Sequence, residues 1–245
     1  MSDPPTDAPL DDLEDTVRRA DPDRWLASRF IADPEARGDV IALYAFDHVL
    51  ARVPHQVSEP LMGEIRLTWW SEALDEIYGG GAVRAHPVAL ALADAVRRRG
   101  LVRAPLDALI ETRFGDLSPE PFADLAAAAA YADMTAGALT QAAVQALGGG
   151  VDAPGAMLAG RAYGLAQMAH RRAIGGRSRL PAGLDVRGAV AEARRAAAVD
   201  LRGLPVRAFP AVAYVCLARR YADGAHLTML EKQARMVLAA LTGTA

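Results

Sequence analysis

The chain has 245 residues, of which 52% are hydrophobic and 23% are charged, and its formal net charge is −3. This length suits one large domain, and this charge gives no general electrostatic basis for binding nucleic acid or an anionic membrane. The single cysteine, Cys216, excludes an internal disulfide framework and favours a reducing compartment.

The first residues are acidic and rich in proline, so residues 1–9 are predicted to form a disordered tail before a helical domain over residues 10–245. They match neither a secretory signal nor an arginine-rich transit peptide. The longest uncharged stretch, residues 134–151, contains threonine, glutamine and glycine, and predicts a buried central helix instead of a membrane span. We therefore expect a cytoplasmic protein with no transmembrane segment.

Along the rest of the chain, apolar residues recur at spacings of three and four, which predicts amphipathic helices. The predicted helices cover residues 10–20, 22–31, 36–52, 60–78, 87–99, 104–116, 120–148, 153–174, 188–203, 205–222 and 226–242. Pairs such as Asp33-Pro34 and His86-Pro87 place a proline in the first helical turn. Triple glycines at 79–81 and 148–150 end helices. The pattern contains no convincing strand alternation, so the predicted fold class is all-α, in a single domain.

Several segments, in this order, carry a resemblance to a known family. Residues 23–53 read DRWLASRFIADPEARGDVIALYAFDHVLARV, and the later segments read GEIRLTWWSEALDEIY, HPVALALADAVRRRGL, YADMTAGALTQAAVQALGG and GGRSRLP. Over about residues 23–188 they resemble the squalene/phytoene synthase family, whose members join two isoprenoid diphosphates head to head. The resemblance implies an isoprenoid-synthase-like helical bundle around a central cavity.

The chain departs from the family pattern where that pattern has aspartates. Aligning the family's Tyr-Ala-Phe motif with Tyr44 places the first acids of the pattern at Ala51, Arg52 and His55. The second segment, residues 167–176, contains arginines and no acid. In the family these carboxylates hold magnesium on the diphosphates, and magnesium requires several oxygen ligands. We therefore predict no catalytic residue, no metal site and no cofactor.

The segment YAFDHVLARVPHQVSEPLMGEIRLTWWSEAL is similar to one branch of this family, which includes the mitochondrial complex I assembly factor. That branch lacks the aspartate clusters as well. The resemblance implies a non-catalytic accessory protein with a protein partner in respiratory complex assembly. Such a protein would act in the cytoplasm or peripherally at the cytoplasmic membrane.

Arginines and aromatic residues supply the candidate sites. Arginine side chains suit phosphate and acidic groups, although a basic helix end and surface charge explain the same residues. The ligand- or anion-binding candidates are Arg171, Arg172, Arg179, Arg52 and His55. Aromatic residues beside the expected cavity either pack in the core or line a pocket for a prenyl or quinone tail. The cavity-lining candidates are Tyr44, Phe46, Trp69, Tyr131 and Gly137.

Three functional hypotheses follow. The leading one is a catalytically degenerate member of the family that acts as a binding or accessory factor. The second is an active prenyltransferase with displaced magnesium ligands, which requires acids such as Asp47, Asp75 and Asp133 to converge on one cavity. We expect instead that Asp47 pairs with a neighbouring arginine and that Asp75 lies at a solvated helix end. The third is a non-catalytic carrier of an isoprenoid lipid, which requires a long apolar tunnel.

Overall fold

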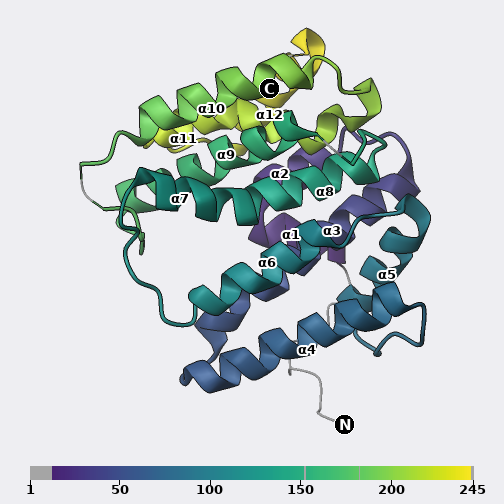
Figure 1. The fold of residues 1–245 in the computed structure, drawn as a ribbon. Helices are drawn as coiled ribbons and strands as arrows, with labels where there is room; N and C mark the ends of the chain where they lie inside the picture. Colours follow the sequence, from purple (N-terminus) through teal and green to yellow (C-terminus); the bar gives the residue numbers. More distant parts are fainter. Residues whose placement is uncertain (1–12, 152, 182, 244–245) are drawn as a thin grey trace.

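The structure is a computed structural model that describes residues 13–243, apart from positions 152 and 182. All regular elements in these residues are helical, and they form one bundle (Figure 1). The prediction of a single all-α domain is confirmed. The predicted tail at residues 1–9 lies outside the described residues.

The first half of the bundle consists of six α-helices. They are α1 (Leu13–Ala20), α2 (Pro22–Ser28), α3 (Pro34–Gln56), α4 (Pro60–Gly79), α5 (Pro87–Arg99) and α6 (Ala104–Gly115). The prolines predicted to open helices lie in their first turns. At α3, the Asp33 carboxylate also accepts a hydrogen bond from the backbone N–H of Glu35 at 3.0 Å, which satisfies one of the unpaired donors of a helix start.

The second half contains α-helices interrupted by one π-helical and two 3₁₀-helical segments. Its elements are α7 (Leu125–Ala132), the π-helical η1 (Asp133–Gly137), α8 (Ala138–Ala146), α9 (Pro154–Ala173), α10 (Val186–Leu201), the 3₁₀-helical η2 (Val206–Ala211) and η3 (Ala213–Leu217), α11 (Ala218–Ala222) and α12 (Met229–Thr242). Residues 134–151, predicted to form a buried central helix, contribute the fully buried Leu139 and Ala143 of α8.

Two segments differ from the predicted helices. Residues 120–124 precede α7 instead of belonging to it, because Asp124 caps that helix by accepting from the N–H of Ala127 at 2.8 Å. Residues 205–222 form two 3₁₀ stretches and only one short α-helix. Pro210 lies inside the first of these stretches, and a proline in that position removes a backbone donor that an α-helix would need.

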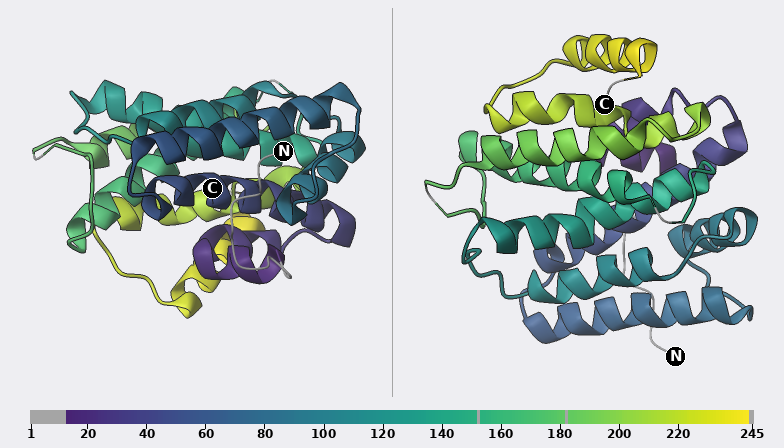
Figure 2. Two further views of the ribbon diagram at one scale, coloured as in Figure 1. Left: turned by 90° about the horizontal axis from the view of Figure 1, so that it is seen from below. Right: turned by 45° about the horizontal axis from the view of Figure 1, so that its top comes forward.

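The core lies around α3, which packs against α1, α5, α6 and α8, while α9 packs against α8 and α10. In Figure 1, α4 lies at one side of the bundle and α10 at the other, and Figure 2 shows the same layers from two further directions. A fully buried carboxylate, Asp39, ties α3 to α5 by accepting from Arg98 and from Arg99, the latter at 2.6 Å. Within the described residues, no helix is long and apolar enough to cross a bilayer.

Candidate functional site

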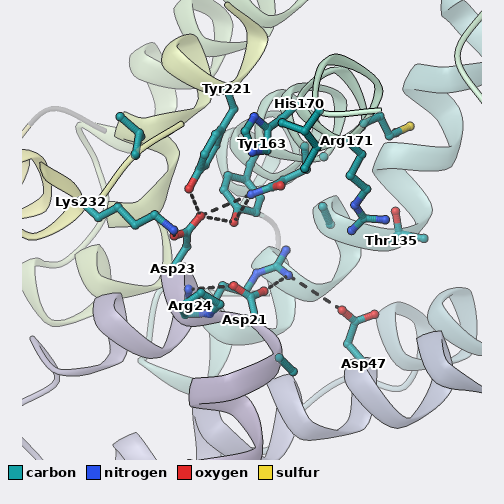
Figure 3. A pocket seen from close by; sticks show the side chains of 18 of the residues that line it. Asp21, Asp23, Arg24, Asp47, Thr135, Tyr163, His170, Arg171, Tyr221 and Lys232 are labelled. Carbon is teal, nitrogen blue, oxygen red and sulfur yellow. Dashed lines mark hydrogen bonds and ion pairs between the residues drawn. The ribbon is translucent and has the colours of Figure 1, made fainter. Parts of the chain in front are cut away.

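A cavity of about 410 Å³ lies where α2, α3, α9 and the segment between α11 and α12 meet. Its wall is unusually rich in charge. The charged and polar residues that line it include Asp21, Asp23, Arg24, Asp47, Arg113, Thr135, Tyr163, Gln167, His170, Arg171, Tyr221 and Lys232. Figure 3 shows ten of these side chains projecting toward one another from different helices.

The start of α2 supplies the acidic side of the cavity. Asp21 is the N-cap of this helix and accepts from the backbone N–H of Arg24 at 3.0 Å, and Pro22 occupies the first turn. This local geometry places Asp23 in the interior, where only 3% of its side chain is exposed. Tyr163 and Tyr221 donate hydroxyl hydrogen bonds to Asp23 Oδ2 at 2.8 and 2.7 Å.

Lys232 of α12 neutralises the buried charge of Asp23. Its ammonium Nζ lies 2.8 Å from Asp23 Oδ1, and 13% of the lysine side chain is exposed. A carboxylate removed from water in this way persists only with paired charge and hydrogen bonds. The ion pair therefore fixes α12 against α2.

Arg24 lies in the middle of the site, with 7% of its side chain exposed. Its Nη1 is 2.9 Å from Asp21 Oδ2 and 3.9 Å from Asp47 Oδ2, and its guanidinium stacks near the rings of Tyr163 and Tyr214 at 5.3 and 5.1 Å. Burial alone would lower the pKa of Arg24, but these tyrosines and aspartates raise it well above its ordinary value. In the described part of the chain, its Nε and Nη2 have no hydrogen-bond partner.

Arg113 of α6 lies in the opposite wall of the cavity. It donates from Nη2 to Asp47 Oδ1 at 2.9 Å and from Nη1 to Asp116 Oδ2 at 3.0 Å and to the Tyr131 hydroxyl at 2.9 Å. The predicted ion pair between Asp47 and a neighbouring arginine is thus confirmed. Burial raises the pKa of Tyr131 to about 12, so its hydroxyl stays protonated at neutral pH. Among the described residues, the Nε of Arg113 has no hydrogen-bond partner.

The mouth of the cavity lies at the end of α9. The exposed Arg171 projects there, and Figure 3 shows its guanidinium beside Thr135 of the π-helical segment. His170 packs against the ring of Tyr221 at 4.9 Å. Burial, together with the nearby His226 and Lys232, lowers the pKa of His170 below its ordinary value. The imidazole is therefore neutral at physiological pH.

The structure separates the predicted anion-binding residues. Arg171 lines the cavity, whereas Arg172 donates to the carbonyl of Pro181 at 2.7 Å. Arg179 donates to Asp116 Oδ1 at 2.9 Å and to the carbonyl of Glu120 at 2.6 Å. The other two candidates, Arg52 and His55, are exposed in the last turns of α3, outside the lining of this cavity.

The predicted cavity-lining residues are divided in the same way. Tyr131 lines the cavity, whereas Tyr44 lies outside its lining, with its ring 5.8 Å from the Arg24 guanidinium. Phe46 and Trp69 belong to an aromatic cluster in the core, each packed edge to face against Trp70 at 5.6 and 4.9 Å. Gly137 ends the π-helical segment, where an added Cβ would lie 3.2 Å from Met157 of α9.

Sequence reasoning did not identify the residues that contribute most charge to the cavity. Asp21, Asp23 and Arg24 stand in a dense run of charge at a helix start, which alone suggests ordinary capping. Lys232 carried a clearer signal, because it is the only lysine in a chain with 27 basic residues. The lysine ammonium is a compact point charge, whereas the arginine guanidinium is a planar fork, so the two residues are not interchangeable at a buried position.

The residues of the cavity do not fit a magnesium cluster. Asp21, Asp23 and Asp47 each lie within 2.9 Å of an arginine or lysine nitrogen. Across residues 13–243, leaving aside 152 and 182, no group of three or more His, Cys, Asp or Glu residues is placed to hold a metal ion. Asp75 and Asp133 pair elsewhere, with Arg103 at 2.7 Å and Arg161 at 2.6 Å. The side chain of Asp75 is 65% exposed, as predicted for a solvated helix end.

Comparisons with known proteins agree with this fold. A family profile described as squalene/phytoene synthase matches residues 17–172. The protein named NADH dehydrogenase (ubiquinone) complex I, assembly factor 6, from Bos taurus, is 30% identical over 132 residues, which is 54% of this chain and 39% of that protein. The Homo sapiens protein of the same name matches with the same identity and coverage. A Dictyostelium discoideum homologue is 25% identical over 117 residues, 48% of this chain and 33% of that protein.

The matched segment thus spans well under half the length of these relatives. Among solved structures, squalene synthase HpnC from Alicyclobacillus acidocaldarius superposes with a TM-score of 0.63 at 15% sequence identity, and the match covers 94% of both chains. At this identity the likeness is one of fold.

Proposed function

The chain belongs to the squalene/phytoene synthase family, and we propose that it is a member that acts by binding and has no transferase activity. Its proposed role is that of a cytoplasmic accessory factor in the assembly of respiratory complex I. The names of its curated relatives supply this role, and the chemistry of the cavity supports the loss of transfer.

One observation carries the proposal. The three aspartates of the cavity are neutralised by cations of the chain itself, namely Arg24, Arg113 and Lys232. Departure of a diphosphate needs metal ions to absorb the developing negative charge, and those ions need carboxylates that are open to them. Here an incoming cation would have to displace a buried, hydrogen-bonded arginine or lysine from each aspartate, which is costly.

The same cavity retains donors suited to an anion without a metal. The Nε and Nη2 of Arg24 and the Nε of Arg113 are buried and, among the described residues, lack hydrogen-bond partners. Arg171 adds a third guanidinium at the mouth. Because unsatisfied buried donors are costly, we propose that a phosphate or carboxylate group of a ligand or partner occupies this position.

A thermal-unfolding experiment tests this binding. Inorganic diphosphate in the presence of EDTA should stabilise the protein, by about 2.7 kcal/mol at one hundred times its Kd. Arg171→Ala should weaken this stabilisation, whereas the matched control Arg172→Ala should retain it, because Arg172 is turned toward Pro181. Stabilisation that appears only with magnesium, or that is equal in both variants, would contradict the proposed site.

The accessory role is tested in the organism that carries the chain. A strain lacking the protein should lose NADH dehydrogenase activity and assembled complex I, while its carotenoid and hopanoid contents stay unchanged. Restoring the wild-type chain should restore the complex. Normal complex I together with a loss of isoprenoid products would contradict the proposal and favour an enzyme.

The two other hypotheses receive less support. A transferase with displaced ligands needs converging acids, yet Asp75 and Asp133 lie outside the cavity lining and pair with arginines. A lipid carrier needs a long apolar tunnel. The region beneath the candidate aromatic residues is instead packed, with Phe46 and His86 meeting Trp70 edge to face at 5.6 and 4.9 Å.

A further inference from the structure

Helix α12 presents apolar side chains on two opposite sides. Its inward face is small and buries Met236 and Ala239. Its outward face carries Leu230, Val237, Leu238 and Leu241, which are 75%, 45%, 61% and 81% exposed. At 3.6 residues per turn these four positions share one side of the helix, which we call the outer stripe. A continuous exposed apolar stripe of this kind marks an interaction surface.

The C-terminal segment that includes α12 is basic, although the whole chain has a net charge of −3. Residues 186–243 contain nine arginine or lysine residues and four aspartate or glutamate residues. The exposed Arg220 and Arg235 are close enough to Glu231, at the start of α12, to act on it electrostatically. The net charge of the whole chain therefore conceals a basic excess in its C-terminal segment, and two of these arginines lie near the start of α12.

We propose that the outer stripe of α12 docks this protein on the surface of an anionic lipid bilayer. An exposed aliphatic stripe flanked by arginines is the pattern of a helix that lies in the interface between headgroups and acyl chains. A second copy of the chain fits less well, because a two-fold contact would bring the same basic surface against itself. A protein partner fits less well too, since the stripe lacks the aromatic anchors that dominate such interfaces.

The position of α12 suits this docking. Figure 2 shows α12 at the edge of the molecule, beyond α11, where a flat surface can reach it. The stripe faces away from the cavity, while Lys232 on the inward side of the same helix reaches Asp23. Docking therefore leaves the cavity ion pair intact and brings the wall of the cavity close to the membrane. This proposal is independent of the ligand assigned to the cavity.

Vesicle flotation with the full chain tests the proposal. The protein should float with vesicles made of equal parts phosphatidylcholine and phosphatidylglycerol, bind phosphatidylcholine vesicles weakly, and dissociate as sodium chloride is raised. The double variant Leu238→Glu with Leu241→Glu should lower the partition coefficient at least about tenfold. The matched control Leu61→Glu with Ile65→Glu changes residues of α4 that are 61% and 51% exposed, and it should bind as the wild type does.

Circular dichroism and unfolding midpoints verify that each variant is folded. If the α12 double variant does not fold, Arg220→Gln with Arg235→Gln decides, because it should weaken binding to anionic vesicles while leaving the stripe in place. Three results would overturn the proposal: no flotation of the wild type, loss of binding in the α4 control instead of the α12 variant, or a wild-type dimer in light scattering that the α12 variant abolishes.

Discussion

Replacement of Lys232 by methionine isolates the charge that neutralises Asp23. Methionine keeps the length and the apolar stem of lysine but removes its ammonium group. Asp23 then stays buried, with a side chain that is 3% exposed in the intact pair, and keeps the hydroxyl hydrogen bonds of Tyr163 and Tyr221. Removing one partner of a buried ion pair costs about 3–5 kcal/mol. The two remaining hydrogen bonds place the expected loss at the lower end, about 3 kcal/mol.

Urea unfolding of a double-mutant cycle measures this loss. Asp23→Asn should cost less than Lys232→Met, because the freed lysine can turn toward water while the amide still accepts from the tyrosines. The double variant should then be about 1–2 kcal/mol more stable than Lys232→Met alone, since it no longer buries an unpaired carboxylate. Additive losses, or a cost below about 0.5 kcal/mol for Lys232→Met, would show that Lys232 does not neutralise a buried charge on Asp23.

Three further predictions concern single residues. Gly160→Ala should destabilise the protein by about 1–3 kcal/mol in urea unfolding, because the added Cβ would lie 2.4 Å from the carbonyl oxygen of Ala136. The control Gly38→Ala should stabilise α3 by about 0.5–1 kcal/mol, because a Cβ at this position would have nothing within 4 Å. Equal effects of the two substitutions on stability would contradict the close packing at Gly160. Burial raises the pKa of Cys216 to about 11, so its reaction with a thiol reagent near pH 8 should be much slower in the folded protein than in urea, and equal rates would be inconsistent with this burial. Burial also lowers the pKa of His170 below 6.5. The stability of the protein should therefore fall as the pH drops through 6.5, because the unfolded chain takes up a proton there that the folded chain does not. An NMR titration midpoint above 6.5 for His170 would contradict this.

Local chemistry explains why the helices could be predicted. Prolines at first turns and glycines at helix ends act within a few residues, so positions such as Pro34, Pro60 and Gly80 show where helices begin and end. Prediction failed at residues 205–222, where Pro210 and tertiary packing favour 3₁₀ turns over an α-helix. The family pattern supplied the arrangement of the helices.

The cavity could be predicted only in part, because its contacts join distant parts of the chain. Asp23 meets Tyr163 and Tyr221 across 140 and 198 positions, and no local pattern encodes these pairings. Arg171 and Arg172 are adjacent in the sequence, so they point in different directions on one helix. Which of the two faces the cavity depended on how α9 packs.

The proposed function requires that this fold works here without metal-dependent transfer of isoprenoid groups. The most direct test is the release of inorganic diphosphate when the purified protein is incubated with farnesyl or geranylgeranyl diphosphate and magnesium. We predict release no faster than in the protein-free control. Sustained release over many turnovers, with squalene, phytoene or a presqualene-type product, would contradict the proposed function.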